Sequence, residues 1–177
     1  IGKYNSMLAD IKSEFNTATN ERDKLNSLLT LIMLETGIRV GGGKPGKVIK
    51  RQKDGSEIEI ETYGLTELRP SHFSSLKNSK LNISMEGKYG VVNLFELSDK
   101  DIISALQPYI AKAALDAGLD LGNIPQEPKV FMGLNGWVYH YSKLNKYIKR
   151  KYANYGLKSH DFRMLFANRR LFAKMEA

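Results

Sequence analysis

Apolar residues recur at helical spacing early in the chain and predict a buried helix over residues 21–36. These residues lie three or four positions apart and are Leu25, Leu28, Leu29 and Ile32. Asn20 precedes the run as a candidate N-cap, and Gly37 follows it as a candidate left-handed C-terminal residue. Residues 1–20 mix polar and apolar positions, and we expect a short helix or a lead-in segment there.

Two stretches rich in strand-forming residues fold back on a turn, and each predicts a β-hairpin. The first, over residues 47–62, is highly charged and turns at the Asp-Gly pair of positions 54 and 55. The second, over residues 80–97, turns at a Gly-Lys-Tyr-Gly sequence that contains Lys88. Residues 72–76 predict one more short strand. Together these segments predict a small antiparallel sheet of about three strands.

The rest of the chain predicts helices. Apolar residues at helical spacing follow a capping pattern formed by Ser98 and Asp101, and Pro108 predicts a kink or break inside that helix. Two further helices are expected, over residues 141–155 and from residue 159 onward. The predicted fold class is therefore α+β and mainly helical, with helices packed around the small sheet.

The last predicted helix has an unusual distribution of side chains. At 100° per residue, Phe162 and Phe166 lie on a main apolar face, and Met164 lies on a second apolar strip on the opposite side. Arg163 falls between the two, which would shelter its guanidinium and leave it able to grip a phosphate through two hydrogen bonds. The alternative is structural: Arg163 pairs with Asp161 or Glu67.

The composition of the chain excludes several classes of site and function. With 177 residues and 42% hydrophobic content, the chain is long enough for one domain with a core, and it has no apolar run long enough for a membrane span. The absence of cysteine excludes disulfides, thiolate catalysis and cysteine-ligated zinc. Three scattered histidines give no metal-ligand spacing, and His72 and His140 are expected to be packed or surface residues. The sequence GGGKPGK lacks the ending of a nucleotide-binding P-loop.

Positive charge is concentrated at one end of the chain. The formal net charge is +8, and residues 141–177 hold ten Lys or Arg against two acidic residues, so they carry the whole excess. Clustered bases favour a polyanion partner, because neutralised phosphates release counterions. The bases predicted to bind DNA are Lys143, Lys146, Lys149, Arg150, Lys151, Arg170 and Lys174. A soluble pair of basic helices without a ligand is the alternative.

Five short motifs occur in a familiar order, at residues 34–42, 63–73, 85–91, 144–152 and 160–163. They read LETGIRVGG, YGLTELRPSHF, MEGKYGV, LNKYIKRKY and HDFR. In this order and approximate spacing they resemble the catalytic domain of type IB DNA topoisomerases, most closely the poxvirus-like and bacterial branch. The related tyrosine recombinases share the arginine, hairpin lysine and His-x-x-Arg parts.

The resemblance implies a set of catalytic residues. Arg39 and Arg163 match the two arginines that clamp the scissile phosphate, and Lys88 matches the hairpin lysine that protonates the departing 5′ oxygen. His160 stands where topoisomerases of this branch usually have lysine and recombinases have histidine. The family also has a nucleophilic tyrosine after the HDFR helix. None of the nine tyrosines here follows Arg163, so no nucleophile is assigned.

The resemblance divides the chain into a lead-in, residues 1–20, and a C-terminally incomplete catalytic core, residues 21–177. We expect a piece of an intracellular, DNA-associated enzyme that relaxes supercoiled double-stranded DNA through a 3′-phosphotyrosyl link. Cofactor, metal, nucleotide and membrane are not required, and a monomer is expected. As given, the chain should bind DNA weakly and not cleave it. Two alternatives stay open: a tyrosine recombinase or integrase, and a DNA-binding remnant without catalysis.

Overall fold

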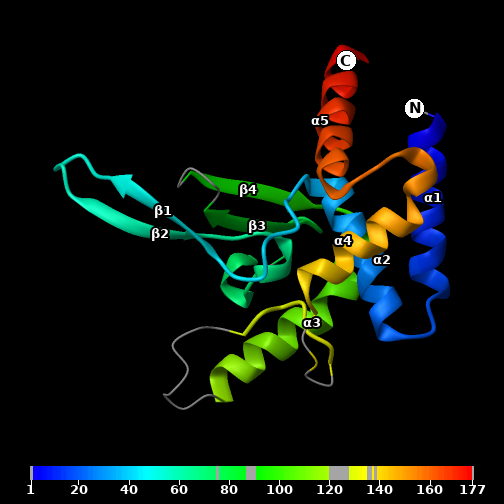
Figure 1. Cartoon of the computed structure of the whole chain (residues 1–177). Coiled ribbons are helices and arrows are strands. Elements are labelled where there is room, and N and C mark those ends of the chain that lie inside the picture. The colour runs from blue at the N-terminus through cyan, green and yellow to red at the C-terminus, as the bar shows by residue number, and fades with distance from the viewer. Residues whose placement is uncertain are drawn as a thin grey trace.

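The structure is a computed structural model that describes residues 2–74, 76–86, 91–119, 128–134, 137 and 139–176. Within these residues the chain forms a mainly helical α+β fold, as predicted (Figure 1). The helices are α1 (Gly2–Thr17), α2 (Glu21–Thr36), α3 (Lys100–Leu119), α4 (Tyr141–Lys151) and α5 (Ser159–Glu176). The strands are β1 (Gly46–Arg51), β2 (Glu57–Thr62), β3 (Leu81–Glu86) and β4 (Val92–Leu97). Short 3-10 turns lie at Leu65–Glu67, Pro70–His72 and Ala153–Tyr155.

Helix α2 is the centre of the fold, with α1, α3, α4, α5 and β4 packed against it. Both of its predicted caps are confirmed. The side chain of Asn20 accepts a hydrogen bond from the backbone N–H of Asp23 at 2.9 Å, and Gly37 ends the helix with a φ of 73°. From Leu28 to Leu34 every residue is buried, as expected of a helix with neighbours on all sides.

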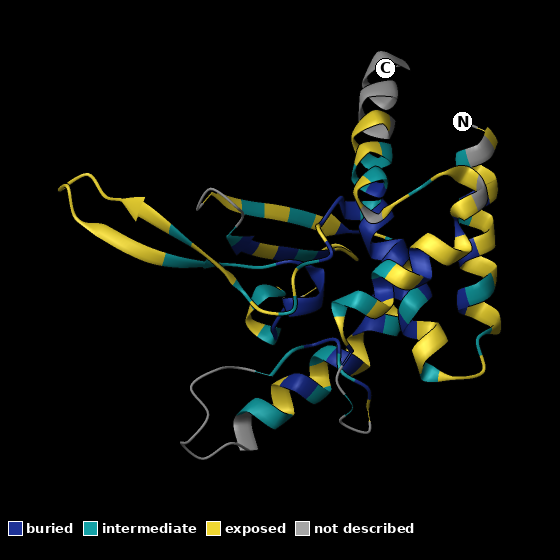
Figure 2. Cartoon of the chain, in the orientation of Figure 1, coloured by how far each residue is buried: buried dark blue, intermediate teal, exposed yellow. Residues whose placement is uncertain are grey.

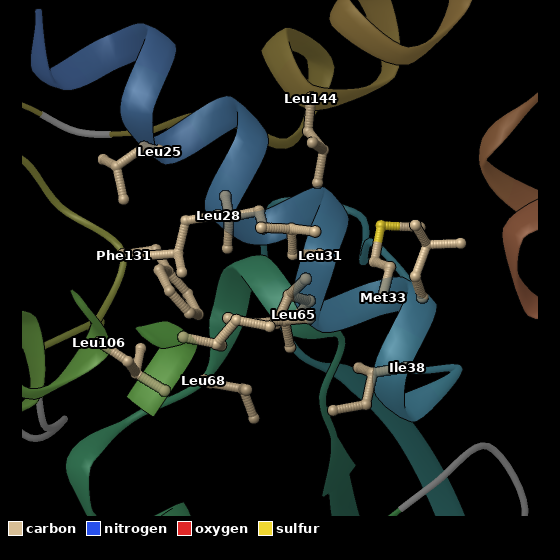
Figure 3. Packing of buried hydrophobic residues seen from close by; sticks show 14 of the residues in the cluster. Leu25, Leu28, Leu31, Met33, Ile38, Leu65, Leu68, Leu106, Phe131 and Leu144 are labelled. Atoms are coloured by element: carbon tan, nitrogen blue, oxygen red, sulfur yellow. The ribbon is translucent and has the colours of Figure 1, made fainter. Parts of the chain in front are cut away.

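The hydrophobic core surrounds α2 and draws side chains from most of the other elements. Figure 3 shows Leu28 and Leu31 of α2 close to Leu65, Leu106 and Phe131, which come from three other parts of the chain. Helix α1 also belongs to this core, through residues that include Met7 and Ile11. Figure 2 shows the buried residues concentrated where these helices meet.

The two predicted hairpins are present, but they do not form one sheet. Strands β1 and β2 pair antiparallel, with Lys47 opposite Glu61, and β3 and β4 pair antiparallel, with Leu81 opposite Leu97. In the described residues these are two separate two-stranded sheets, so the predicted three-stranded sheet is wrong. The β1–β2 hairpin has almost no buried positions and extends away from the body, as Figure 1 shows. Its apolar residues Val48, Ile58 and Ile60 are at most partly buried, because the hairpin points away from the body instead of lying beside β3.

Three further local predictions were wrong. The described residues within 72–76 form no strand: a 3-10 turn ends at His72, and Phe73 makes one isolated bridge to Ile83. Helix α3 runs on through Pro108, so the predicted break there is wrong, whereas a kink stays a prediction. Burial of Leu106 and Tyr109 on either side of the proline outweighs the intrahelical hydrogen bond that it removes. Its first turn is capped by Asp99, not Ser98, through the backbone N–H groups of Asp101 and Ile102 at 3.0 and 3.2 Å.

Helix α5 begins against the body and then extends from it (Figure 1). Phe162 is fully buried, Leu165 and Phe166 are partly buried, and Met164 on the predicted second apolar strip is 50% exposed. The start of the helix is therefore the part that packs, and it is also the part that carries the predicted site residues.

Candidate functional site

A cleft of about 1030 Å³ brings together three of the four predicted catalytic residues. Arg39 comes from the segment after α2, and His160 and Arg163 come from the first two turns of α5. The other walls come from the end of β2, from β3–β4 and from α4. Residues lining these walls include Lys44, Thr62, Tyr63, Met85, Phe95 and Asn145.

The backbone around Arg39 is held from both sides, although its side chain is exposed. The N–H of Leu65 donates to the carbonyl of Arg39 at 2.6 Å, and the N–H of Thr66 donates to the carbonyl of Val40 at 3.0 Å. The flanking side chains of Ile38 and Val40 are buried in the core. Arg39 is thus an exposed side chain on a fixed backbone.

Glu67 fixes the glycine-rich segment that follows Arg39. Its side chain is 1% exposed. One carboxylate oxygen, Oε1, accepts from the N–H groups of Gly42 and Gly43 at 2.7 and 2.8 Å, and Oε2 accepts from Gly64 at 2.7 Å. A carboxylate that accepts several N–H groups is well stabilised even when buried.

Small residues are required where this segment crosses the strand end. A Cβ added at Gly64 would lie 2.3 Å from the Cα of Gly41, so the two backbones touch directly. Sequence reasoning considered Glu67 only as a partner of Arg163. The signal that could have shown its local role is its position three residues after Gly64, which is the spacing of a carboxylate that accepts the N–H at the start of a helical turn.

Arg163 binds the backbone rather than a carboxylate. Its Nε–H donates to the carbonyl of Gly37 at 2.9 Å. Asp161 instead accepts from the N–H of Lys158 at 2.7 Å, and no ion pair of Arg163 occurs among the described residues. The alternative in which Arg163 pairs with Asp161 or Glu67 is therefore wrong for this part of the chain. Burial, and then the positive charge of Arg39, lower the pKa of the Arg163 guanidinium.

The two remaining catalytic predictions have different outcomes. His160 is exposed at the start of α5 and lines the cleft. Lys88 lies outside the described residues. The strands on either side of its turn are described, however, and Met85 and Val91, near the turn on each side, both line the cleft. The described ends of β3 and β4 that flank Lys88 in the sequence therefore lie at the cleft.

The basic residues of α4 divide into two groups. The side chains of Lys143, Lys146, Lys149 and Arg150 are exposed, on the same helix as the cleft residue Asn145. Lys151 is different, because it forms an ion pair with Glu14 of α1 at 3.3 Å. The predicted DNA-binding side chains of Arg170 and Lys174 lie outside the described residues.

The aromatic residues before α4 pack against the core. Tyr139 is buried and its hydroxyl donates to the side-chain carbonyl of Asn26. The indole N–H of Trp137 donates to Glu21 at 3.3 Å. His140 caps α4, where its Nδ1 accepts from the N–H of Ser142 at 3.3 Å. These contacts tie the start of the basic helix to α2.

The described part of the chain lacks the features of a metal site and of a membrane span. It contains no cluster of three or more His, Asp or Glu side chains that could hold a metal ion. None of its helices combines the length and apolarity needed to cross a bilayer. The charged residues that line the cleft are Arg39, Lys44, Arg163 and Glu67, and the carboxylate of Glu67 is occupied by backbone N–H groups. Positive charge therefore predominates, and the chemistry it favours is the binding of an anion.

Comparison with known proteins shows which fold surrounds this cleft. No family model and no curated protein matches the sequence. A pre-cleavage complex of the XerH site-specific recombinase bound to difH substrate matches with a TM-score of 0.59 and 19% identity, over 98% of this chain and 43% of that one. The post-cleavage complex with palindromic difH substrate gives 0.55 and 19%, over 92% and 40%. The chain thus spans about two fifths of those recombinase chains and shares their fold.

Proposed function

We propose that this chain is part of an enzyme that breaks and rejoins DNA strands through a 3′-phosphotyrosyl intermediate. The observation that carries the proposal is that Arg39 and Arg163, from distant parts of the sequence, line one cleft together with His160. The shared fold with a site-specific recombinase supports it, since enzymes of that class act on DNA.

The proposed roles of the arginines follow from the charge that the reaction creates. Attack on a phosphodiester gives a pentacoordinate centre with more negative charge than the ground state. Two guanidinium groups that are already in place can stabilise this charge without reorganisation and without a metal ion or cofactor. Arg163 approaches the phosphate from α5 and Arg39 from the segment after α2. His160 adds a third donor from the start of α5.

The departing oxygen also needs a proton, which we assign to Lys88. A lysine that acts as a general acid must lose its proton readily, and nearby positive charges lower the pKa of an ammonium group. In this proposal the β3–β4 turn carries Lys88 to the cleft, where the two arginines supply those charges. The lining residues Met85 and Val91 on either side of the turn support this placement.

Double-stranded DNA is the proposed substrate, and α4 is the proposed surface along which it lies. The exposed bases Lys143, Lys146, Lys149 and Arg150 would neutralise backbone phosphates on either side of the cleft. Arg170 and Lys174 of α5 remain predicted contacts, whereas Lys151 would first have to leave Glu14. No tyrosine follows Arg163, so the reaction requires a nucleophile from outside these 177 residues.

Two activities within this class are supported by different observations. The five sequence motifs support a type IB topoisomerase, which relaxes supercoiled DNA. His160 in the cleft and the fold shared with XerH support a tyrosine recombinase. A form of the protein that supplies the tyrosine would distinguish them. Relaxation of any plasmid by a monomer, without ATP or Mg²⁺, identifies a topoisomerase, and strand exchange between defined sites by a multimer identifies a recombinase.

The phosphate site itself can be tested with the 177-residue chain. A labelled duplex with a nick that carries a 3′-phosphate places an anion at the proposed position, and its affinity can be followed by fluorescence anisotropy. We expect Arg39→Ala and Arg163→Ala each to weaken binding by about tenfold and to reduce the salt dependence by about one phosphate contact. Arg51→Ala, which removes an equal charge from the end of β1, is the control. Binding unchanged in the two cleft variants would overturn the proposal.

A further inference from the structure

The hydrogen bond from Arg163 to Gly37 joins α5 to the end of α2. The last carbonyl groups of a helix have no partner within it and carry partial negative charge. Gly37 follows the last turn of α2, and its own N–H bonds back to the carbonyl of Met33 at 2.8 Å. The Nε–H of Arg163 then satisfies the carbonyl of Gly37 at 2.9 Å. The carbonyl of Gly37 at the C-terminus of α2 is therefore the hydrogen-bond acceptor that holds the guanidinium of Arg163.

Only glycine fits position 37, for two independent reasons. Its φ of 73° is left-handed, a conformation that residues with a Cβ adopt at a cost. In addition, a Cβ there would lie 2.6 Å from Cδ1 of Phe166. Phe166 stands one turn after Arg163 on α5, so the ring covers Gly37 while the guanidinium holds its carbonyl. The side chains of Arg163 and Phe166, both on α5, therefore both contact Gly37.

We propose that Gly37 is a positioning residue for the paired arginines: its carbonyl holds Arg163 by Nε, before any anion binds, so that the two Nη groups are presented to the cleft beside Arg39. This inference rests on the proposed function, because it gives the fixed guanidinium a phosphate to bind. It goes beyond that function by assigning the spacing of the two arginines to the backbone of residues 37–39.

The guanidinium geometry supports the assignment. An arginine has five N–H donors in a planar fork, and the bond to Gly37 uses only the one on Nε. Among the described residues the Nη groups form no other hydrogen bond or ion pair. They can therefore donate end-on to two oxygens of one phosphate.

The backbone from Gly37, whose carbonyl binds Arg163, to Arg39 is held in place by packing. Arg39 follows Gly37 by two residues, and Ile38 between them is 1% exposed in the core. The two like charges are close enough for Arg39 to lower the pKa of Arg163, and an unanchored pair would drift apart to relieve the repulsion. The bond to Gly37 opposes that drift, so less rearrangement is needed when an anion arrives.

The anchor can be tested in the free protein, without DNA. In ¹⁵N-arginine spectra, we expect the Nε–H of Arg163 to exchange with water about tenfold more slowly than that of exposed Arg39, as one hydrogen bond predicts. Gly37→Ala should abolish the difference, and urea unfolding will show whether that variant folds. Equal exchange of the two Nε–H groups in the unsubstituted chain would overturn the inference, whatever the protein does with DNA.

A second test uses charge-preserving variants and the duplex with the 3′-phosphate nick. Lysine has one nitrogen, so Arg163→Lys must choose between the Gly37 carbonyl and the phosphate. We expect it to lose about tenfold in affinity, close to Arg163→Ala, whereas Arg39→Lys loses about threefold. Equal losses in the two lysine variants would count against the anchor. If the alanine variants of both arginines bind normally, the proposed function fails while the exchange measurement still decides on the anchor.

Discussion

The two hairpins have the same length of strand and the same antiparallel pairing, yet only one of them belongs to the core. In β3, Leu81, Ile83 and Met85 alternate with more exposed residues, and all three are buried. In the β1–β2 hairpin nearly every residue is exposed (Figure 2). Both hairpins contain alternating apolar residues, since Ile58 and Ile60 alternate with glutamates in β2. Alternation therefore predicts a strand, but it does not by itself decide whether the hairpin packs onto the body.

The exposed hairpin is held by its own cross-strand pairs and by its root. Lys47 forms an ion pair with Glu59 at 2.7 Å, and Arg51 pairs with Glu57 at 3.4 Å. Such exposed pairs contribute little, and an isolated two-stranded hairpin is marginal in water. The root of the hairpin, which is the backbone just before β1 and just after β2, is held more firmly. There Glu67 accepts hydrogen bonds from N–H groups on both sides of the hairpin. The predictions below separate the packed hairpin, the root and the exposed strands.

The largest difference is expected between two isoleucines. Ile83 in β3 is 0% exposed, and Ile49 in β1 is 70% exposed. Ile83→Ala should lower the free energy of unfolding by about 2–4 kcal/mol through lost burial and a cavity. Ile49→Ala should change it by no more than about 0.5 kcal/mol. Urea unfolding followed by circular dichroism measures both, and similar losses would mean that the exposed hairpin is packed in solution.

Loss of one acceptor oxygen from Glu67 should weaken the root of the hairpin and lower the stability of the protein. Glu67→Gln keeps the shape of the side chain, but its NH₂ group cannot accept from the N–H groups that one carboxylate oxygen now binds. We expect a loss of about 1–3 kcal/mol in the free energy of unfolding. Glu59→Gln on β2 is the matched control, and it should be close to neutral. If Glu67→Gln leaves the free energy of unfolding unchanged, these hydrogen bonds do not hold the root of the hairpin.

Acid should act on the body of the molecule through Asp99, which lies two residues after β4 and joins the start of α3 to Lys12 of α1. Burial alone would raise the pKa of its carboxyl, but hydrogen bonds from the N–H of Ile102, from Lys12 and from the N–H of Asp101 lower it overall. Because the folded pKa lies below the unfolded one, this stabilisation is present above the unfolded pKa and is lost as the pH falls through the folded pKa.

Asp99→Asn should therefore flatten the acid dependence of stability and cost about 0.5–1 kcal/mol near neutral pH. Urea midpoints measured from pH 7 to acid pH provide the check. The companion variant Asp54→Asn should change the profile less. Ser56 lowers the pKa of Asp54 from two residues away, and that contact can persist in the unfolded chain. A steeper acid response in Asp99→Asn than in the unsubstituted chain would contradict the linkage.

Shortening the exposed hairpin should have the smallest effect. If Lys47 and Glu61, which face each other in the register, are joined by an Asn-Gly turn, the free energy of unfolding should change by less than about 1 kcal/mol. The corresponding cut in the packed hairpin, between Asn82 and Glu96, removes core residues and should prevent folding. Calorimetry of the two shortened chains checks the pair, and a large loss in the first would mean that the hairpin stabilises the body.

Local signals predicted local structure well. Asn20 and Gly37 mark the ends of α2 because a cap is decided by the few residues around it. The Asp-Gly turn and the alternating runs predicted both hairpins for the same reason. The joining of the hairpins into one sheet could not be predicted, because it depends on which strand edges meet. The high charge of the β1–β2 hairpin was the available sign that they would not.

The site was predicted in part. The arginines and His160 were identified through a resemblance to a family, and the structure then placed them in one cleft. The contacts of Glu67 and of the Gly37 carbonyl were missed, because both involve backbone groups that folding brings close. A carboxylate that accepts N–H groups 25 residues away leaves no spacing pattern in the sequence. The partner of Arg163 was sought among acids, whereas the structure supplies a carbonyl.

The exposure of the β1–β2 hairpin also has an evolutionary consequence. Selection on core packing cannot constrain strands that touch so little, and surface connections tolerate insertions and deletions. Chains descended from the same ancestor should therefore differ most in length between the glycine segment and Thr62, while keeping Glu67 and the residues around Arg39. This stretch is also where a fluorophore or an affinity tag could be grafted without disturbing the rest of the molecule.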